Sequence, residues 1–273
     1  MNDIRLLALD VDDTLLQSDF SLSSRTRTVV KNALEQGVLV ALISGRIPQD
    51  MERFSQLLGM NKRLGFLASN NGSLIQESHT GAIIHETRLD PKTVLAICDF
   101  ADAEGFPVQM YENNVMYISR RNEFSDCDER LTGVRQVVVE NFRAMISEGC
   151  YKLLIPGDPE VLPQIKDLIL SYLGSSITLF TSRTFFLEIM PENTNKGTAL
   201  AHIAARVGVR PEQTLAIGDA MSDEAMIRWA GIGVAMANAD ERLKKIARVI
   251  SEHTNNEDGV ADIIETYILH KRK

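Results

Sequence analysis

The sequence predicts an α/β fold in which a Rossmann-like parallel-sheet core is interrupted by an inserted α+β domain. The first observation is a set of short apolar runs bounded by Gly, Asp, Asn or Ser: "LLALDV", "VLVALISG", "GFLASNNG", "TLAIGDA" and "GIGVAM". Continuous hydrophobicity over such lengths is typical of strands buried on both faces. The second observation is that the pattern alternates more between Ile83 and Phe186, as in half-buried strands.

Helical patterns separate the apolar runs of the core. Arg25 to Gln36 has a helical apolar spacing and is followed by Gly37, a typical C-terminal stop. The segment "NKGTALAHIAARVG" runs in the same way to Gly208. Strand, helix and strand in series predict a parallel sheet with helices on both faces.

The middle of the chain predicts a separate domain. Its strands are expected in "NVMYISRR", "QVVVEN", "CYKLLIPG", "ITLFTS" and "FFLEIMP", with helices over Pro91 to Glu104 and Pro159 to Leu173. Alternating strands with two helices predict a layer that leaves one face of its sheet open. We therefore expect the core in residues 1–84 and 188–273 and the inserted domain in residues 85–187.

Composition excludes several kinds of partner. The chain has 273 residues, 44% of them hydrophobic, and a formal net charge of -8, so it has no sequence-wide basic surface for nucleic acid or acidic membranes. Its three cysteines are an odd number without paired zinc spacing, which favours a reducing compartment. It has no apolar run of 18 residues and no signal-peptide pattern. We expect a cytoplasmic protein that is a monomer or a weak homo-oligomer.

Polar residues follow the predicted core strands. Because ligands of open α/β sheets bind beyond the carboxyl ends of the strands, these residues should face one cleft. They are Asp10, Asp12, Asp13 and Thr14 after the first strand, Ser44, Gly45 and Arg46 after the second, Ser69, Asn70, Asn71 and Gly72 after the third, and Gly218, Asp219, Ser222 and Asp223 after the late one.

The carboxylates among these residues predict a Mg²⁺ site. Asp10 and Asp12 lie two positions apart, so their side chains point to the same side while the chain stays extended. Two such carboxylates repel, and a divalent cation relieves the repulsion. With Asp219 as a third carboxylate, oxygen ligands suit Mg²⁺, whereas the absence of Cys and His from these loops argues against zinc.

The other polar groups suit a phosphate. "SGR" offers the Ser44 hydroxyl and backbone N–H groups at a helix start, which is a natural anion site. Lys196 can place a positive charge on a phosphate oxygen. A metal, a lysine and an anion-binding turn around carboxylates favour phosphoryl transfer, and a carboxylate that attacks phosphorus divides the reaction into two steps.

Four motifs together resemble the haloacid dehalogenase superfamily of phosphohydrolases. They are "DVDDTLL", "ISGR", "NKG" and "GDAMSDEAM", in the order and spacing of that superfamily. The insertion between the second and third motifs resembles the Cof-type subfamily, as do "SNNGSLI" and "NNEDGVADII". The resemblance implies a phosphatase of small phosphorylated metabolites, such as sugar phosphates, with the inserted domain acting as a cap that selects the substrate.

The resemblance also implies the role of each site residue. Asp10 would be the nucleophile and a Mg²⁺ ligand, and Asp12 the general acid and base, with its backbone carbonyl on the metal. Asp219 would bind the metal, and Asp223 would bind a metal-bound water or orient Lys196. The phosphate would be held by residues near the first two motifs and by the lysine: Val11, Thr14, Ser44, Gly45 and Lys196.

Four positions leave alternatives open. Asp13 stands where the family more often has Gly, which is tolerable if its side chain points to solvent. Ser222 replaces the commoner Asn, so its phosphate contact is open. Arg46 either contacts the substrate or pairs with a carboxylate, and Asn71 is either a left-handed turn residue before Gly72 or a substrate contact.

Three rival functions share parts of this pattern. A phosphomutase of the same superfamily would return the phosphoryl group to sugar, and a non-catalytic sugar-phosphate sensor would keep the pocket without turnover. A signalling receiver also gathers Asp, Ser or Thr, and Lys around Mg²⁺, but such a domain is far shorter and has no inserted cap.

Overall fold

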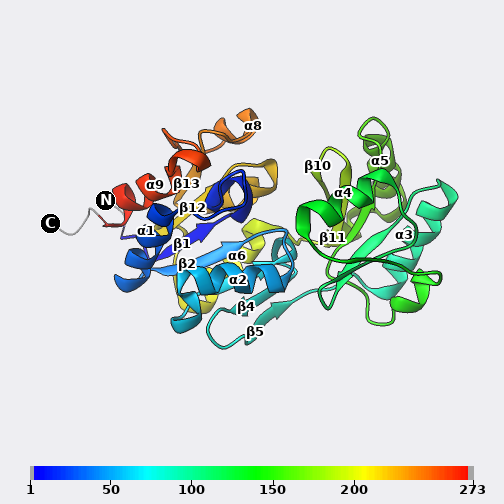
Figure 1. Ribbon diagram of the computed structural model, residues 1–273, viewed down its shortest axis with the longest axis horizontal. Coiled ribbons are helices and arrows are strands. Elements are labelled where there is room, and N and C mark those ends of the chain that lie inside the picture. The colour runs from blue at the N-terminus through cyan, green and yellow to red at the C-terminus, as the bar shows by residue number, and fades with distance from the viewer. Residues whose placement is uncertain (1–2, 270–273) are drawn as a thin grey trace. The chain divides into compact units, whose positions relative to one another are not determined.

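The computed structural model describes residues 3–269 and divides the chain into two compact units. The core unit comprises residues 1–86 and 195–273, and the inserted unit comprises residues 87–194 (Figure 1). Both boundaries fall later than those expected after residues 84 and 187. The reason is that strand β5 (Ile83–Glu86) pairs within the core sheet, whereas β11 (Phe186–Pro191) pairs along its length within the sheet of the inserted unit.

The core unit is built on a mixed sheet with the strand order β14-β13-β12-β1-β2-β3-β4-β5. Its parallel part confirms the Rossmann-like core, while the hairpin of β4 and β5 adds antiparallel strands at one edge that the sequence did not predict. The parallel strands are β1 (Leu6–Leu9), β2 (Leu39–Ile43), β3 (Phe66–Ser69), β12 (Thr214–Gly218), β13 (Ile232–Ala235) and β14 (Val249–Ile250), and β4 is Leu74–Glu77.

Helices cover both faces of the core sheet. From β1 the chain moves to β2 and β3 in one direction, and from β12 to β13 and β14 in the other. Because parallel crossovers are right-handed, the helices of the two series lie on opposite faces. The first series holds α1 (Ser24–Glu35) and α2 (Pro48–Leu58), with α9 (Gly259–Tyr267) against α1, and the second holds α7 (Glu224–Trp229) with α6 (Lys196–Val207) against it.

The reversal of strand order places a switch point between β1 and β12. These two strands are direct neighbours, with Leu9 beside Ile217, and all of their residues are buried. Ligand sites of open α/β sheets lie at such a point, beyond the carboxyl ends of the strands. The residues that follow β1 and β12 therefore occupy the position that the fold favours for binding.

The inserted unit is a second sheet with helices, which confirms the predicted α+β domain. Its strand order is β10-β11-β9-β6-β7-β8. The strands are β6 (Gln109–Glu112), β7 (Val115–Ile118), β8 (Gln136–Val138), β9 (Leu153–Pro156) and β10 (Ile177–Arg183), and the helices are α3 (Pro91–Ala103), α4 (Glu123–Thr132) and α5 (Leu162–Leu173).

The expectation of one open sheet face is wrong for the middle of this unit. Helices α3 and α5 share one hydrophobic core with one face of the sheet, and β9 and β11 are nevertheless buried at every residue. Helix α4, which the sequence did not predict, contributes to this. Its Asp128 accepts hydrogen bonds from Gln109 and Tyr111, which alternate along β6 with the core residue Met110.

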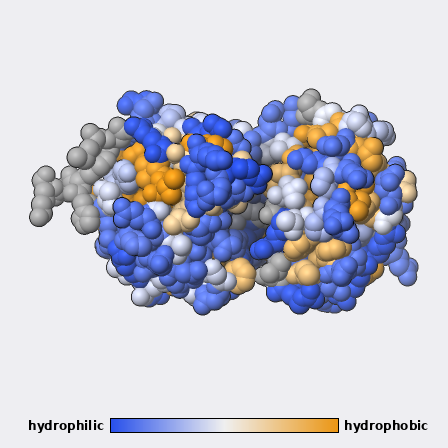
Figure 2. Space-filling view, turned by 90° about the horizontal axis from the view of Figure 1, so that it is seen from above, coloured by the Kyte–Doolittle hydropathy of each residue, from blue (hydrophilic) through white to orange (hydrophobic). Residues whose placement is uncertain are grey.

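The surface is mostly hydrophilic, as expected for a charged chain. Figure 2 shows charged and polar residues over most of one face, with smaller apolar areas on each unit. In the inserted unit, Leu168, Leu170 and Tyr172 of α5 are exposed. Within the described residues, every helix falls short of the length and apolarity needed to span a membrane.

Candidate active site

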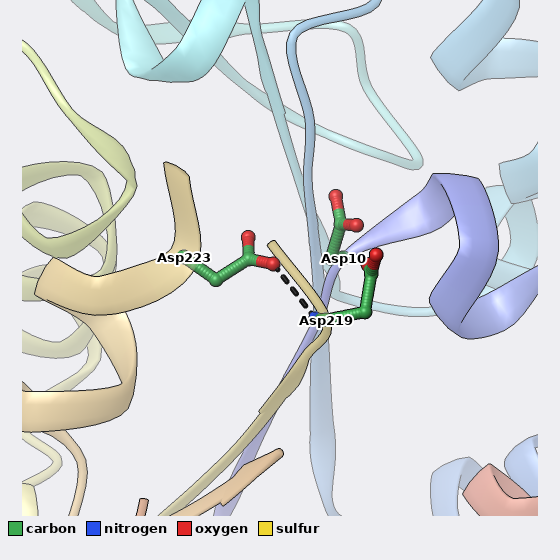
Figure 3. Close-up of side chains that lie close together, drawn as sticks. All are labelled: Asp10, Asp219 and Asp223. Atoms are coloured by element: carbon green, nitrogen blue, oxygen red, sulfur yellow. Dashed lines mark hydrogen bonds between the residues drawn. The ribbon is translucent and has the colours of Figure 1, made fainter. Parts of the chain in front are cut away.

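Three aspartates gather beyond the carboxyl ends of β1 and β12. Asp10 follows β1, Asp219 follows β12, and Asp223 lies in the turn Met221–Asp223. Each offers a carboxylate oxygen, and these atoms lie within 4.8 Å of one another (Figure 3). Residues about 210 positions apart in the chain thus meet because β1 and β12 are neighbours in the sheet.

Lys196 joins two of these carboxylates. Its Nζ donates to Asp10 Oδ1 and to Asp223 Oδ1, both at 2.6 Å, and all three side chains are buried. Lys196 is the first residue of α6, and Asn195 caps that helix by accepting from the N–H groups of Gly197 and Thr198. The cap fixes the residue at which α6 begins and therefore the position of the Lys196 backbone.

A glycine brings α6 close enough for this contact. A Cβ on Gly197 would lie 2.6 Å from the backbone carbon of Ala225 in α7, so any larger residue would separate the two helices. Glycine permits the backbones to approach, and the approach carries Lys196 to the carboxylates.

Asp223 is held from two sides. Its Oδ2 accepts from the backbone N–H of Asp219 at 2.9 Å (Figure 3). The same oxygen accepts from the N–H of Ala220 at 3.0 Å, while Oδ1 accepts from Lys196. Gly218 leaves room for it, because a Cβ there would lie 2.6 Å from the Cβ of Asp223. Asp223 therefore orients both the lysine and the backbone that carries Asp219.

The group carries more negative than positive charge. Three carboxylates share one ammonium, so the fully ionised group has two negative charges in excess. Burial and the repulsion of Asp223 raise the pKa of Asp10 well above its usual value, and the same two causes raise the pKa of Asp219 to about 7. Burial alone lowers the pKa of Lys196, but the carboxylates of Asp10 and Asp223 outweigh it and raise that pKa.

This donor set fits Mg²⁺. The ligand atoms are all carboxylate oxygens, which hard divalent cations prefer, and a divalent charge balances the excess of two. The raised pKa of Asp219 indicates a carboxylate that lacks a positive partner. Asp12 lies outside this group of side chains, so its implied metal contact depends on its backbone carbonyl alone.

Asp12 points instead to Arg46. The chain leaves the extended conformation in the turn Val11–Leu15, so the expectation that Asp10 and Asp12 share one side does not hold. Arg46 Nε donates to Asp12 Oδ2 at 2.8 Å and Nη2 donates to Oδ1 at 2.6 Å. For Arg46, the structure thus shows the carboxylate pairing that was one of its two open alternatives.

The turn after β1 explains the residues between and beyond these aspartates. Asp13 has φ 53°, a left-handed conformation that Gly adopts freely and Asp tolerates, and its side chain is exposed as expected. Thr14 donates to Asp219 Oδ1 at 2.7 Å, so it touches the carboxylate group rather than standing apart from it. Val11 is fully buried.

The second and third strand ends are tied together. Ser44 is buried, its carbonyl accepts from the N–H of Asn71 at 2.8 Å, and its hydroxyl accepts from the N–H of Arg46 at 3.2 Å. A Cβ on Gly45 would come within 3.3 Å of the Asn71 side chain. Asn71 has φ 54° and is buried, so it is the left-handed residue that one of its two interpretations required.

Ser222 lies between Met221 and Asp223 and is half-buried. Three further residues near the site were not identified from the sequence. Asp50 Oδ2 accepts from Arg46 Nη1 at 3.2 Å. Two asparagines hold the turn after β1: Asn238 donates to the carbonyl of Asp13 at 2.8 Å, and Asn255 donates to the carbonyl of Leu16 at 3.0 Å. The segment "NNEDGV" was a signal for Asn255, because so polar a stretch needs partners when it is buried.

Comparisons with known proteins identify the family of the chain. The model of the haloacid dehalogenase-like hydrolase family matches residues 7–264. The chain belongs to this family. The resemblance in the four motifs is therefore confirmed, and the protein is a hydrolase of the haloacid dehalogenase type.

Related proteins cover nearly the whole chain. "Putative phosphatase YxeH" of Bacillus subtilis is 29% identical, with 98% of this chain and 99% of that protein covered. "5-amino-6-(5-phospho-D-ribitylamino)uracil phosphatase YcsE" of the same organism is 28% identical, with 98% and 97% covered. A crystal structure of a haloacid dehalogenase-like hydrolase from Bacteroides thetaiotaomicron is 31% identical, with a TM-score of 0.89 and 96% and 99% of the chains covered. Both units thus have counterparts in these relatives.

Proposed function

We propose that this hydrolase is a Mg²⁺-dependent phosphatase of small phosphorylated metabolites, with Asp10 as its nucleophile. The observation that carries the proposal is the group of Asp10, Asp219 and Asp223 at the switch point of the sheet, in which Lys196 binds the buried Asp10 and Asp223 and Asp219 is half-buried. Relatives named as phosphatases cover nearly the whole chain, which supports the same reaction class.

In the first step Asp10 attacks phosphorus. A bond forms between a carboxylate oxygen of Asp10 and phosphorus, the bond between phosphorus and the ester oxygen breaks, and the leaving oxygen takes a proton from Asp12. Lys196 and the backbone N–H groups near Val11 and Ser44 neutralise charge on the phosphoryl oxygens. When bound by Asp10, Asp219 and Asp223, Mg²⁺ supplies positive charge that offsets the repulsion between the carboxylates and the phosphate.

In the second step water releases the phosphate. Asp12, now a carboxylate, takes a proton from water, and the water oxygen bonds to the phosphorus of the aspartyl-phosphate. The bond between phosphorus and Asp10 breaks, which restores the Asp10 carboxylate and frees inorganic phosphate. Two carboxylates therefore divide the chemistry, one as nucleophile and one for proton transfer.

We further propose that the inserted unit, residues 87–194, selects the substrate. This unit has its own sheet and hydrophobic core, so it can vary without disturbing the residues that hold Asp10 and Lys196. The proposed binding partner is a small phosphorylated metabolite rather than nucleic acid, in accord with the net charge of -8.

A panel of phosphorylated metabolites, assayed for inorganic phosphate with Mg²⁺ and with a chelator, tests the function. We expect Mg²⁺-dependent release that Asp10→Asn lowers by at least about 10³-fold. Asp13→Asn is the matched control, because it changes an exposed aspartate of the same turn to a residue that also tolerates φ 53°. Undiminished turnover in Asp10→Asn, or isomerised sugar phosphate without phosphate release, contradicts the proposal.

A further inference from the structure

The proton-transfer residue Asp12 is held by a cation of its own. Both of its carboxylate oxygens accept from Arg46, at 2.8 and 2.6 Å, in a bidentate pair that fixes the plane of the carboxylate as well as its position. Asp10 pairs with a different cation, Lys196, through a single hydrogen bond to Oδ1. Two aspartates that are two positions apart in the chain are thus kept on separate partners.

Arg46 is itself fixed by its surroundings. Its Nη1 donates to Asp50 Oδ2 at 3.2 Å, and its guanidinium lies 5.4 Å from the ring centre of Phe54 and 5.8 Å from that of Phe20. Its side chain is 17% exposed, against 32% for Asp12. The arginine is therefore the fixed member of the pair, and the aspartate is the member that solvent and substrate can reach.

The backbone of Arg46 is tied to the predicted phosphate turn. Its N–H donates to the hydroxyl of Ser44 at 3.2 Å, and its carbonyl accepts from the N–H of Asn70 at 2.9 Å. Helix α2 begins two residues later, with Pro48 at its first position, and carries both Asp50 and Phe54. The second strand end, the third strand end and α2 together determine where the guanidinium lies.

We propose that Arg46 is a positioning residue that orients Asp12 for proton transfer to the leaving group. The inference rests on the proposed function, since it assigns Arg46 no contact with substrate and lets it act through Asp12 alone. A planar five-donor group on a fixed side chain can hold one carboxylate orientation, which a flexible ammonium cannot do. The pairing explains why an arginine follows Ser44 and Gly45 at this strand end.

The leaving group of the substrate separates this role from others. Protonation matters for a poor leaving group, such as the alkoxide of a sugar, and matters little for p-nitrophenolate. We expect Arg46→Ala to lower kcat/KM for an alkyl phosphate by about 10²-fold, within the range of general acid catalysis, and for p-nitrophenyl phosphate by less than about 10-fold. Arg46→Lys should restore only part of the loss, because it keeps the charge without the bidentate geometry.

Asp12→Asn provides the second test. If Arg46 acts through Asp12, Arg46→Ala adds no further loss of kcat/KM in the Asp12→Asn background. The wild type, the two single variants and the double variant can also be compared by thermal unfolding without metal. Arg46→Ala should lower the unfolding midpoint less when Asp12 is already Asn. Arg53→Ala removes an exposed arginine of α2 and is the matched control. It should leave the ratio of alkyl to aryl phosphate turnover and the effect of Asp12→Asn unchanged.

Each outcome has a distinct meaning. An equal loss for the alkyl and aryl phosphates, or a further loss in the double variant, overturns the inference and assigns Arg46 to the substrate. Full rescue by Arg46→Lys also overturns it, since charge alone would then suffice. If Asp12→Asn itself leaves alkyl phosphate turnover unchanged, the proposed function fails at Asp12, independently of Arg46.

Discussion

Each unit of the protein buries a group of charged side chains, and the two groups lie at different places on their sheets. In the core unit, Asp10, Asp219, Asp223 and Lys196 lie beyond strand ends, with two negative charges in excess. In the inserted unit, the group lies along β6 and β11, on α4 and directly before β9 rather than beyond strand ends: Gln109, Tyr111, Asp128, Glu188 and Lys152.

The second group is largely compensated. Lys152 lies 3.3 Å from Glu188, and Asp128 accepts from the Tyr111 hydroxyl and the Gln109 amide. Burial and the charge of Asp128 raise the pKa of Tyr111 well above its usual value, so Tyr111 remains a hydrogen-bond donor. These contacts join α4 to the sheet. The comparison indicates that a buried charged group is not by itself a sign of a catalytic site. An excess of negative charge beyond the carboxyl end of a strand is the more informative sign.

Removing the central lysine of each group should give the largest contrast. Lys196→Met removes the cation that binds two buried carboxylates, and Lys152→Met removes the cation 3.3 Å from the Glu188 carboxylate, so each variant should lose about 3–5 kcal/mol of unfolding free energy without metal. Mg²⁺ should restore stability to Lys196→Met and not to Lys152→Met, as thermal unfolding with and without the ion can measure. An equal response of both variants to Mg²⁺ would remove the contrast.

Asp128→Ala should destabilise the protein by about 2 kcal/mol, because it leaves the Tyr111 hydroxyl and the Gln109 amide buried without their acceptor. Chemical denaturation measures this loss. Asp167→Ala on the exposed side of α5 is the control and should stay near wild type. Wild-type stability in Asp128→Ala would mean that α4 does not depend on this contact.

Asp219→Asn should stabilise the metal-free protein at pH 8 by about 2 kcal/mol. Its pKa rises from 3.8 to about 7 on folding, so the folded state binds the proton more tightly. Stability contributed by this group is therefore present at low pH and is lost as the pH rises from about 4 to about 7. The gain in Asp219→Asn should shrink toward pH 4, and a gain that is independent of pH contradicts the assignment.

The smallest expected effect concerns the cysteines. Burial raises the pKa of Cys98 to about 11 and that of Cys150 to about 12, so both remain thiols at pH 8. Cys127 is half-buried. Iodoacetamide should modify Cys127 first in the native protein and all three after denaturation, as peptide mass spectrometry can show. Early modification of Cys150 would contradict the burial that defines the core of the inserted unit.

Much of the fold could be predicted because strand hydrophobicity and strand-end polarity are local signals. "LLALDV" and "TLAIGDA" predicted β1 and β12, and with them the meeting of Asp10 and Asp219. The antiparallel hairpin β4–β5 and helix α4 were missed, since α4 has mostly polar residues and owes its burial to Asp128 and Ser125. The expected division between residues 187 and 188 cuts through "FFLEIMP", a strand expected in the inserted domain, whereas β11 pairs along its length with strands of that unit.

The candidate site could be predicted as a set of residues but not as a geometry. Spacing placed Asp10 and Asp12 on one side, whereas the chain leaves the extended conformation from Val11 onward and Asp12 pairs with Arg46. Asp50 was missed because its role depends on Arg46, four residues earlier on the approach to α2. The sequence contains these partners, but only the packing of α2 against the strand ends selects them.

The proposed reaction has Asp10 attack phosphorus, while Asp12 protonates the leaving group and then activates water. Incubation of Asp12→Asn with p-nitrophenyl phosphate and Mg²⁺, an acid quench and peptide mass spectrometry test it directly, because this leaving group needs little protonation and hydrolysis lacks its base. We predict one phosphoryl group on the peptide that contains Asp10, and none in the variant that also carries Asp10→Asn. Release of p-nitrophenol with the phosphoryl group on another residue, or with Asp10 unmodified, would contradict the account.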